Sequence, residues 1–175
     1  MKNIVATLSL LFATTLSAQV AIGKSSISSP AVSLEFYDGA DNARGIILPW
    51  VTSTAAVTGA VNGTIVYNTA DRKVYVKYAS GWRDLSVDNT GTVTTTLQDS
   101  LTDQDTAKVL IGGDPSTDTT PGILVLADTN KAMVLPKVAS PHLNIVNPSP
   151  GMMVYDTTKK QLAVFNGTVW SFWKP

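Results

Sequence analysis

The chain has 175 residues, with 13 Lys and Arg against 13 Asp and Glu and a net charge near zero at neutral pH. Because charged residues make up only 15% of the sequence, nothing in its electrostatics favours binding to nucleic acid or to an anionic membrane surface. The absence of cysteine excludes disulfides, thiolate metal sites and a lipid attached to an N-terminal cysteine.

The N-terminus has the layout of a secretory signal peptide. Lys2 supplies a positive start, residues 4–16 form an apolar run too short to span a bilayer comfortably, and a small residue, Ala18, suits a signal peptidase. We therefore predict that residues 1–18 are removed and that the mature protein is secreted or held on the outer cell surface. No second apolar segment follows, so we expect no membrane insertion after cleavage.

Two stretches of the chain are close copies of each other. The sequence GTIVYNTADRKVYVKYASGW at residues 63–82 returns as GMMVYDTTKKQLAVFNGTVW at residues 151–170, 88 positions later (151 − 63). Both place their side chains with a period of two, as where Ile65 and Tyr67 alternate with Thr64 and Val66. Each then crosses a polar turn of four or five residues and ends in Trp. This pattern predicts a β-hairpin followed by a third strand. The repeated positions that we take as the structural signature are Gly63, Tyr67, Trp82, Gly151, Tyr155 and Trp170.

The repeat extends upstream of the hairpins. A short strand closed by Gly at residues 18–23 corresponds to residues 107–112, and a Leu-Pro strand at residues 45–51 corresponds to residues 132–138. The Pro removes a backbone donor, so it marks the end of a strand or the edge of a sheet. The chain therefore contains two copies of one series of short strands.

The predicted fold class is all-β, with two homologous small β modules of hairpin and meander units at residues 19–86 and 107–175. The segment between them, residues 87–106, is a polar linker rich in Thr, Asp and Gln, without Lys or Arg. Its aliphatic residues at a spacing of four suit one face of a short helix, whereas its composition suits a flexible spacer. Both interpretations stay open from the sequence.

The size of the modules predicts association. Each has fewer than 70 residues, and a single core of that size seldom supplies more than about 3 to 5 kcal/mol without disulfides, metal or oligomerisation. Both hairpins are also apolar on their two faces, whereas a sheet with water on one side would alternate cleanly. Either the two modules pack face to face or separate chains assemble, and we favour assembly into a homo-oligomer.

The Leu-Pro strand, the loop after it and the hairpin resemble a module of secreted and surface proteins of Bacteroidetes and of adhesin-like and phage tail-fibre proteins. That module has an aliphatic-Leu-Pro strand, an Asn-Pro-rich loop, a Gly-x-x-Val-Tyr-Asn/Asp-Thr hairpin and a Tyr/Phe-Asn-Gly-x-x-Trp ending. Residues 132–170 fit it closely, with Asn147-Pro148 in the loop, whereas the first copy has Asn62 without Pro. The resemblance implies a surface or fibre component, often oligomeric, and carries no catalytic residues across.

A search for catalytic patterns favours a protein that is not an enzyme. His142 is the single histidine and stands in a polar loop, where a solvated side chain is the simpler interpretation than a general base. The chain has no Gly-x-Ser-x-Gly elbow and no phosphate-binding loop. We predict no catalytic residue, no cofactor and no metal site.

The main alternative to a structural or adhesive function is a secreted glycan-binding module, which the four tryptophans suggest. Because Trp82 and Trp170 are repeated, we assign them to the cores. Trp50 corresponds to Lys137 in the second copy, so the fold does not need it, and it is our best candidate for an exposed contact. With Tyr75 and Trp173, it forms the predicted set for a glycan or a partner. The preferred function remains a non-enzymatic, exported structural or adhesive protein that self-associates, as a trimer or as a fibre.

Overall fold

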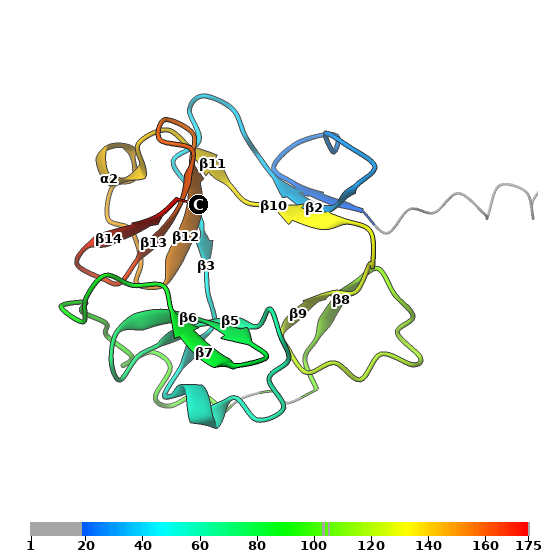
Figure 1. The fold of residues 1–175 in the computed structure, drawn as a ribbon, viewed down its shortest axis with the longest axis horizontal. Coiled ribbons are helices and arrows are strands. Elements are labelled where there is room, and N and C mark those ends of the chain that lie inside the picture. The colour runs from blue at the N-terminus through cyan, green and yellow to red at the C-terminus, as the bar shows by residue number, and fades with distance from the viewer. Residues whose placement is uncertain (1–18, 103, 105, 175) are drawn as a thin grey trace, which may run out of the picture.

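The computed structural model describes residues 19–102, 104 and 106–174 (Figure 1). The predicted signal peptide, residues 1–18, lies outside the described residues. In the described part, the regular structure is fourteen short strands with one 3-10 turn, η2 (Thr54–Ala56), and one four-residue helix, α2 (Pro141–Asn144). The all-β prediction is confirmed.

The strands form two series with the same order. The first series is β1 (Val20–Ile22), β2 (Val32–Phe36), β3 (Ile46–Ile47), β4 (Trp50–Val51), β5 (Ile65–Asn68), β6 (Lys73–Tyr78) and β7 (Gly81–Asp84). The second series is β8 (Val109–Ile111), β9 (Leu124–Leu126), β10 (Ala132–Val134), β11 (Lys137–Val138), β12 (Met152–Asp156), β13 (Gln161–Phe165) and β14 (Trp170–Trp173). The turn η2 follows β4 as α2 follows β11, so each element of the first series has a counterpart in the second.

Strand pairing within the two series is also the same. β1 pairs with β2, and β8 with β9, in parallel. The sheets β4-β5-β6-β7 and β11-β12-β13-β14 each begin with a parallel pair and continue antiparallel. Tyr67 stands opposite Trp50 as Tyr155 stands opposite Lys137. The registers therefore match, and residues of the two copies can be equated one by one.

The hairpin turns explain why the repeated sequence folds locally. Asn68 accepts a hydrogen bond through its side chain from the amide of Ala70 at 3.0 Å, and Asp156 accepts one from the amide of Thr158 at 2.9 Å. Such side-chain bonds to the backbone stabilise a tight reversal of the chain. Each turn closes on a residue with positive φ, and in the first hairpin this is Arg72, at 63°.

Two strands cross from one series to the other. β3 pairs antiparallel with β12, with Ile46 opposite Met153. β10 pairs in parallel with β2, with Met133 opposite Leu34. Figure 1 shows β3 beside β12 and the yellow β10 beside the blue β2. The two series therefore complete each other's sheets within one chain.

The hydrophobic core is shared in the same way. Its larger cluster combines Leu48, Tyr67, Val74 and Leu85 of the first series with Met153 and Val164 of the second. A second cluster lies within the second series, made of Val138, Ile145, Met152, Val154, Ala163 and Phe165. The copies thus pack against each other, which is one of the two solutions that the sequence left open. The module boundaries at residues 19–86 and 107–175 stay a prediction.

The first part of the segment between the two series is held against the second series. Thr92 donates a hydrogen bond through its hydroxyl to the carbonyl of Gly167 at 3.1 Å, and Thr168 donates one to the carbonyl of Thr90 at 2.9 Å. Further along, residues 95–101 form hydrogen-bonded turns rather than a regular helix. The first part of the segment is thus held by hydrogen bonds to the second series, and the linker boundaries at residues 87–106 stay a prediction.

Candidate interaction surface

Trp50, the best sequence candidate for an exposed contact, lies half-buried where the two series meet. Its indole N–H donates to the carbonyl oxygen of Pro150 at 2.9 Å. Its ring centre lies 6.2 Å from that of Tyr67, and it packs against the larger core cluster. Trp50 therefore contacts the second copy of the repeat within the same chain.

Tyr75 and Trp173 are also half-buried and each is held by a different partner. The Tyr75 hydroxyl donates to Asp71 at 2.6 Å, and burial raises the pKa of this phenol above its ordinary range. The Trp173 indole N–H donates to the carbonyl of Leu85, while the guanidinium of Arg83 lies 5.3 Å from the ring centre. Since their partners differ, the contacts do not join these aromatics and Trp50 into one platform.

The signature residues take structural places. Tyr67 is fully buried, and Trp170 is half-buried with its ring 5.3 Å from that of Phe165 at the second cluster. Trp82 and Tyr155 are half-buried. Gly63 and Gly151 both have positive φ, 89° and 77°, which favours glycine at the entry to each hairpin.

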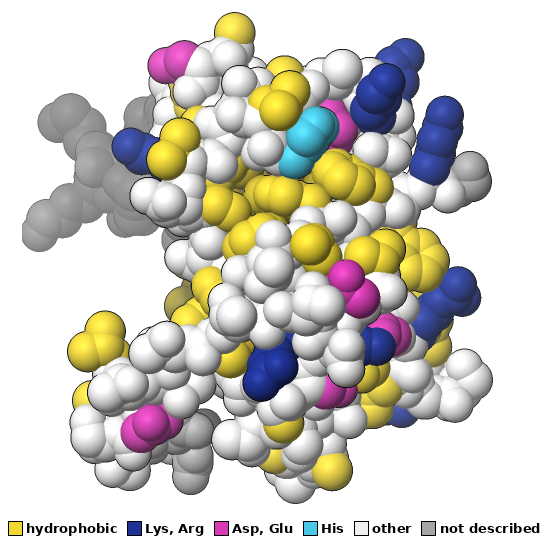
Figure 2. Space-filling model, turned by 90° about the vertical axis from the view of Figure 1, so that its left-hand side faces the viewer, with side chains coloured by type: hydrophobic (Ala, Val, Ile, Leu, Met, Phe, Trp, Pro, Cys, Tyr) yellow, Lys and Arg dark blue, Asp and Glu magenta, His cyan; other side chains and the backbone are white. Residues whose placement is uncertain are grey.

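His142 lies at the start of α2, exposed, with its ring edge-on to that of Phe172 at 5.7 Å. In the described residues, no group of three His, Asp or Glu side chains is arranged to hold a metal ion. Also within the described residues, the structure has no helix with the length and apolarity needed to cross a bilayer. Figure 2 shows hydrophobic side chains gathered across the face on the side of α2 and β14, where Leu143 and Val146 are exposed.

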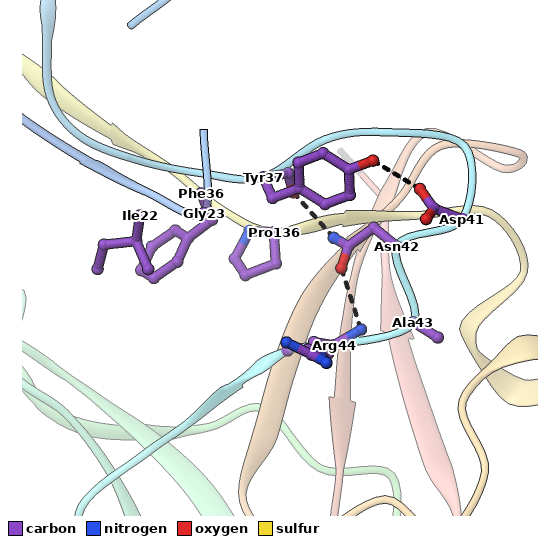
Figure 3. A pocket seen from close by; sticks show the side chains of 10 residues that line it. Ile22, Gly23, Phe36, Tyr37, Asp41, Asn42, Ala43, Arg44 and Pro136 are labelled. Atoms are coloured by element: carbon purple, nitrogen blue, oxygen red, sulfur yellow. Dashed lines mark hydrogen bonds between the residues drawn. The ribbon is translucent and has the colours of Figure 1, made fainter. Parts of the chain in front are cut away.

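One hollow, of about 670 Å³, was not predicted from the sequence (Figure 3). It lies between the ends of β1 and β2 and the loop that follows β2. Its polar side chains are Tyr37, Asp41, Asn42 and Arg44. The Tyr37 hydroxyl donates to Asp41 at 2.7 Å, and this bond raises the pKa of the phenol and lowers that of the carboxyl. The arrangement offers an aromatic ring, a carboxylate and a guanidinium to a polar ligand, without a nucleophile and base in contact.

The sequence signal for this hollow is a difference in loop length. The connection from β2 to β3 covers residues 37–45, nine positions, whereas that from β9 to β10 covers residues 127–131, five positions. Extra residues in one copy of a repeat map to a loop, and such loops often carry the binding function of a repeat protein. The comparison of the two copies could therefore have pointed to this region.

Several exposed apolar residues lie at strands that have one partner strand among the described residues. Val109, Ile123 and Leu124 lie at the two-stranded β8-β9 sheet, and Ile47 lies on β3. An unpaired strand edge with apolar side chains is a template for pairing with another chain. Among the described residues, the free edges of β9 and β3 are therefore candidates for pairing with another chain.

Residues 114–174 match the family model described as phage tail like trimerisation region. The matched segment begins in the loop between β8 and β9 and ends one residue after β14. No curated protein and no solved structure matches the chain. The match supports the tail-fibre part of the resemblance and self-association as a homo-trimer, whereas the Bacteroidetes part stays a prediction.

Proposed function

We propose that this chain is a structural protein that assembles into a homo-trimer and forms part of a surface or fibre-like structure outside the cell. The observation that carries the proposal is the match of residues 114–174 to a trimerisation region, since those residues hold six of the seven strands of the second series. A family defined by trimerisation is a structural family, so the same match supports a role without catalysis.

The surface of the chain supports this role. A monomer that works alone rarely leaves several large aliphatic side chains exposed beside an unpaired strand edge. Here Val109, Ile123, Leu124 and Ile47 are all exposed. Burial between chains would remove them from water and satisfy the backbone groups of the edge strands.

Export is the less direct part of the proposal. It depends on residues 1–18 acting as a cleaved signal peptide, which agrees with a surface or fibre component. Intact-mass measurement of the exported protein tests it. A mass that corresponds to a chain starting at Gln19 supports export, and an uncleaved chain retained in the cell contradicts it.

The trimer itself is tested by light scattering coupled to size-exclusion chromatography of the purified chain across a wide range of concentration. A stable species of three times the chain mass, taken from intact-mass measurement of the same sample, supports the proposal. A strict monomer at every concentration overturns it. An open polymer would keep self-association and overturn the trimer.

A second candidate function is glycan binding, and the hollow in Figure 3 favours it. An aromatic face beside a carboxylate and a guanidinium suits a sugar ring, which has apolar faces and polar edges. The test is a glycan array with the native chain and the variants Tyr37→Ala and Tyr78→Ala, the latter an exposed tyrosine on β6. Glycan binding lost only in Tyr37→Ala supports the candidate, and no bound glycan on the native chain dismisses it.

A further inference from the structure

The two series differ in how many neighbours their corresponding strands have. β2 lies between β1 and β10, whereas β9, its counterpart, pairs only with β8 among the described residues. The burial follows the pairing. Leu34 on β2 is 1% exposed, and Leu124, at the same register position on β9, is 47% exposed.

The same difference occurs at the hairpin entry. The first half of β12 pairs with β3, so that Met152 and Met153 are buried. The corresponding residues of the first series, Thr64 and Ile65, have no strand on that side among the described residues and are half-buried. β5 thus has an unpaired half-edge at the place where β12 receives β3.

The glycine at the hairpin entry also has a close neighbour in the second series and none in the first. A Cβ added to Gly151 would lie 2.8 Å from the Cβ of Tyr67, so the tyrosine of the first series packs directly on this glycine of the second. Gly63, its counterpart, has nothing within 4 Å of such a Cβ. Tyr155, the counterpart of Tyr67, is half-buried rather than fully buried.

In each case, the neighbour that completes the position inside the chain comes from the other series. The first series gives β3 and Tyr67 to the second, and the second gives β10 to β2 of the first. Among the described residues, the edges that would continue this pattern are the free edges of β9 and β10 in the second series and those of β3 and β5 in the first. The second series of one copy and the first series of another are therefore complementary.

We propose that copies of the chain join through these edges, the second series of one copy pairing with the first series of the next as the two series pair within a chain. β9 receives β3 of the next copy in parallel, with Leu124 opposite Ile46 and Val125 opposite Ile47. β10 pairs antiparallel with the entry of the next hairpin, with Met133 opposite Ile65. This inference rests on the proposed trimer and gives it an interface.

The contact joins two different surfaces, so it is heterologous, and such a contact yields a closed ring when its rotation closes. A trimer made in this way contains three identical contacts and leaves no edge of this kind unpaired. Closure of the edges also prevents further strand addition, which is the usual hazard of an exposed edge. The three-fold closed form is thus the arrangement that reconciles the unpaired edges with the trimerisation match.

The absence of cysteine makes a direct test available. Facing residues on neighbouring strands have Cα atoms within the range that a disulfide bridges, about 4.4 to 6.8 Å. The double variant Ile47→Cys, Val125→Cys of the full chain should therefore form interchain disulfides under mild oxidation, giving species of two and three chains on a non-reducing gel. Each single variant should give none above background, and Ile47→Cys with Leu143→Cys, an exposed site on α2, is the position control.

A second variant tests the backbone of β9. Val109 donates to the carbonyl of Ile123 and Ala127 donates to that of Ile111, so odd-numbered residues of β9 face β8. The amide of Leu124 accordingly points to the unpaired edge. Leu124→Pro removes that donor without taking a bond from β8 and should convert the trimer to monomer at concentrations where the native chain is trimeric. Leu124→Ala keeps the amide and should still form the trimer.

The results of these experiments distinguish a wrong interface from a wrong oligomeric state. Cross-links confined to the 47/125 pair, together with loss of the trimer in Leu124→Pro, support the inference. A native trimer that gives no 47/125 cross-link, or that withstands Leu124→Pro with unchanged circular dichroism, overturns this interface and leaves the proposed function standing. A native chain that is monomeric overturns both.

Discussion

The hydroxyl of Tyr67 donates a hydrogen bond to the backbone carbonyl of Asn166 at 2.7 Å, between two residues that are 99 positions apart and fully buried. The bond joins β5 of the first series to the turn that follows β13 in the second. It lies beside the larger core cluster, to which both series contribute. The two copies of the repeat are thus linked by a buried polar contact as well as by apolar packing.

Removal of this hydroxyl should destabilise the protein. Tyr67→Phe keeps the ring but leaves the Asn166 carbonyl without this donor, and we expect the free energy of unfolding to fall by about 1 to 3 kcal/mol. Urea denaturation followed by circular dichroism measures it. Tyr155→Phe, at the corresponding half-buried position, is the control and should change stability by less than the Tyr67 variant. Equal effects of the two variants would contradict the assignment.

Alkaline pH should weaken the fold through the same residue. Burial raises the pKa of Tyr67 to about 12, whereas an unfolded tyrosine titrates near 10. As the pH rises from 10 to 12, the unfolded chain loses this proton first, so stability that is fully present below pH 10 is lost through this window. Denaturation at a series of pH values should show the decrease, and Tyr67→Phe should show a smaller one. An identical pH dependence in both proteins would argue against the buried phenol as the cause.

Gly151 should tolerate no side chain. Its φ is 77°, and a Cβ there would approach Tyr67 too closely, so Gly151→Ala combines backbone strain with a clash. We expect a loss of about 2 to 4 kcal/mol in unfolding free energy. Gly81→Ala has a positive φ, 129°, but nothing within 4 Å of the new Cβ, so it isolates the strain. A loss no larger than that of Gly81→Ala would show that the contact with Tyr67 is unimportant.

Acid should destabilise the first series through Glu35. This buried carboxylate accepts from Lys24 at 2.9 Å and from the amide of Ser28 at 2.6 Å, and the bond to Lys24 is the main reason why its pKa lies below the ordinary value of 4.5. A lowered pKa means that the stabilisation is present above pH 4.5 and is lost as the pH falls through the folded-state value. The thermal midpoint should therefore drop in acid, and Glu35→Gln should flatten that drop. An unchanged acid dependence in the variant would contradict this role.

The shared sheets and core predict one cooperative unfolding transition. β3 completes a sheet of the second series and β10 completes one of the first, so neither series keeps its pairing when the other unfolds. Scanning calorimetry should give a single transition, with equal calorimetric and van't Hoff enthalpies when the van't Hoff value is calculated for a trimer that dissociates as it unfolds. Two separate transitions would show instead that residues 19–86 and 107–175 fold as independent modules.

The local elements were predictable because their physical causes are local. The period-two placement of Ile65 and Tyr67, the Asx residue at each turn and the glycine at each hairpin entry depend on positions a few residues apart. The sequence repeat adds the correspondence of the two hairpins without any knowledge of their packing. These features predicted the all-β class and the hairpins that the structure contains.

The environment of Trp50 could not be predicted from the sequence repeat. The sequence makes it non-essential because Lys137 replaces it in the second copy, and an exposed contact follows as the simplest prediction. In the structure, its indole bonds to the carbonyl of Pro150, at a junction where the two copies meet as unlike surfaces. A residue at such a junction need not be the same in both copies, because Lys137, the counterpart of Trp50, has a different neighbour.

The sequence by itself determined the β-strands, the turns and the two-fold repetition of the series, since these follow from side-chain periodicity and turn chemistry. Only the tertiary structure decided that β3 joins β12 and β10 joins β2, and that β9 has a partner strand on one side alone within the described part of the chain. Strand pairing between segments about a hundred residues apart depends on which edges meet after both copies pack, and an alternating pattern specifies the faces of a strand but not its neighbour. The edge of β9 through which we propose that chains associate is therefore set by the tertiary structure and not by the local sequence pattern.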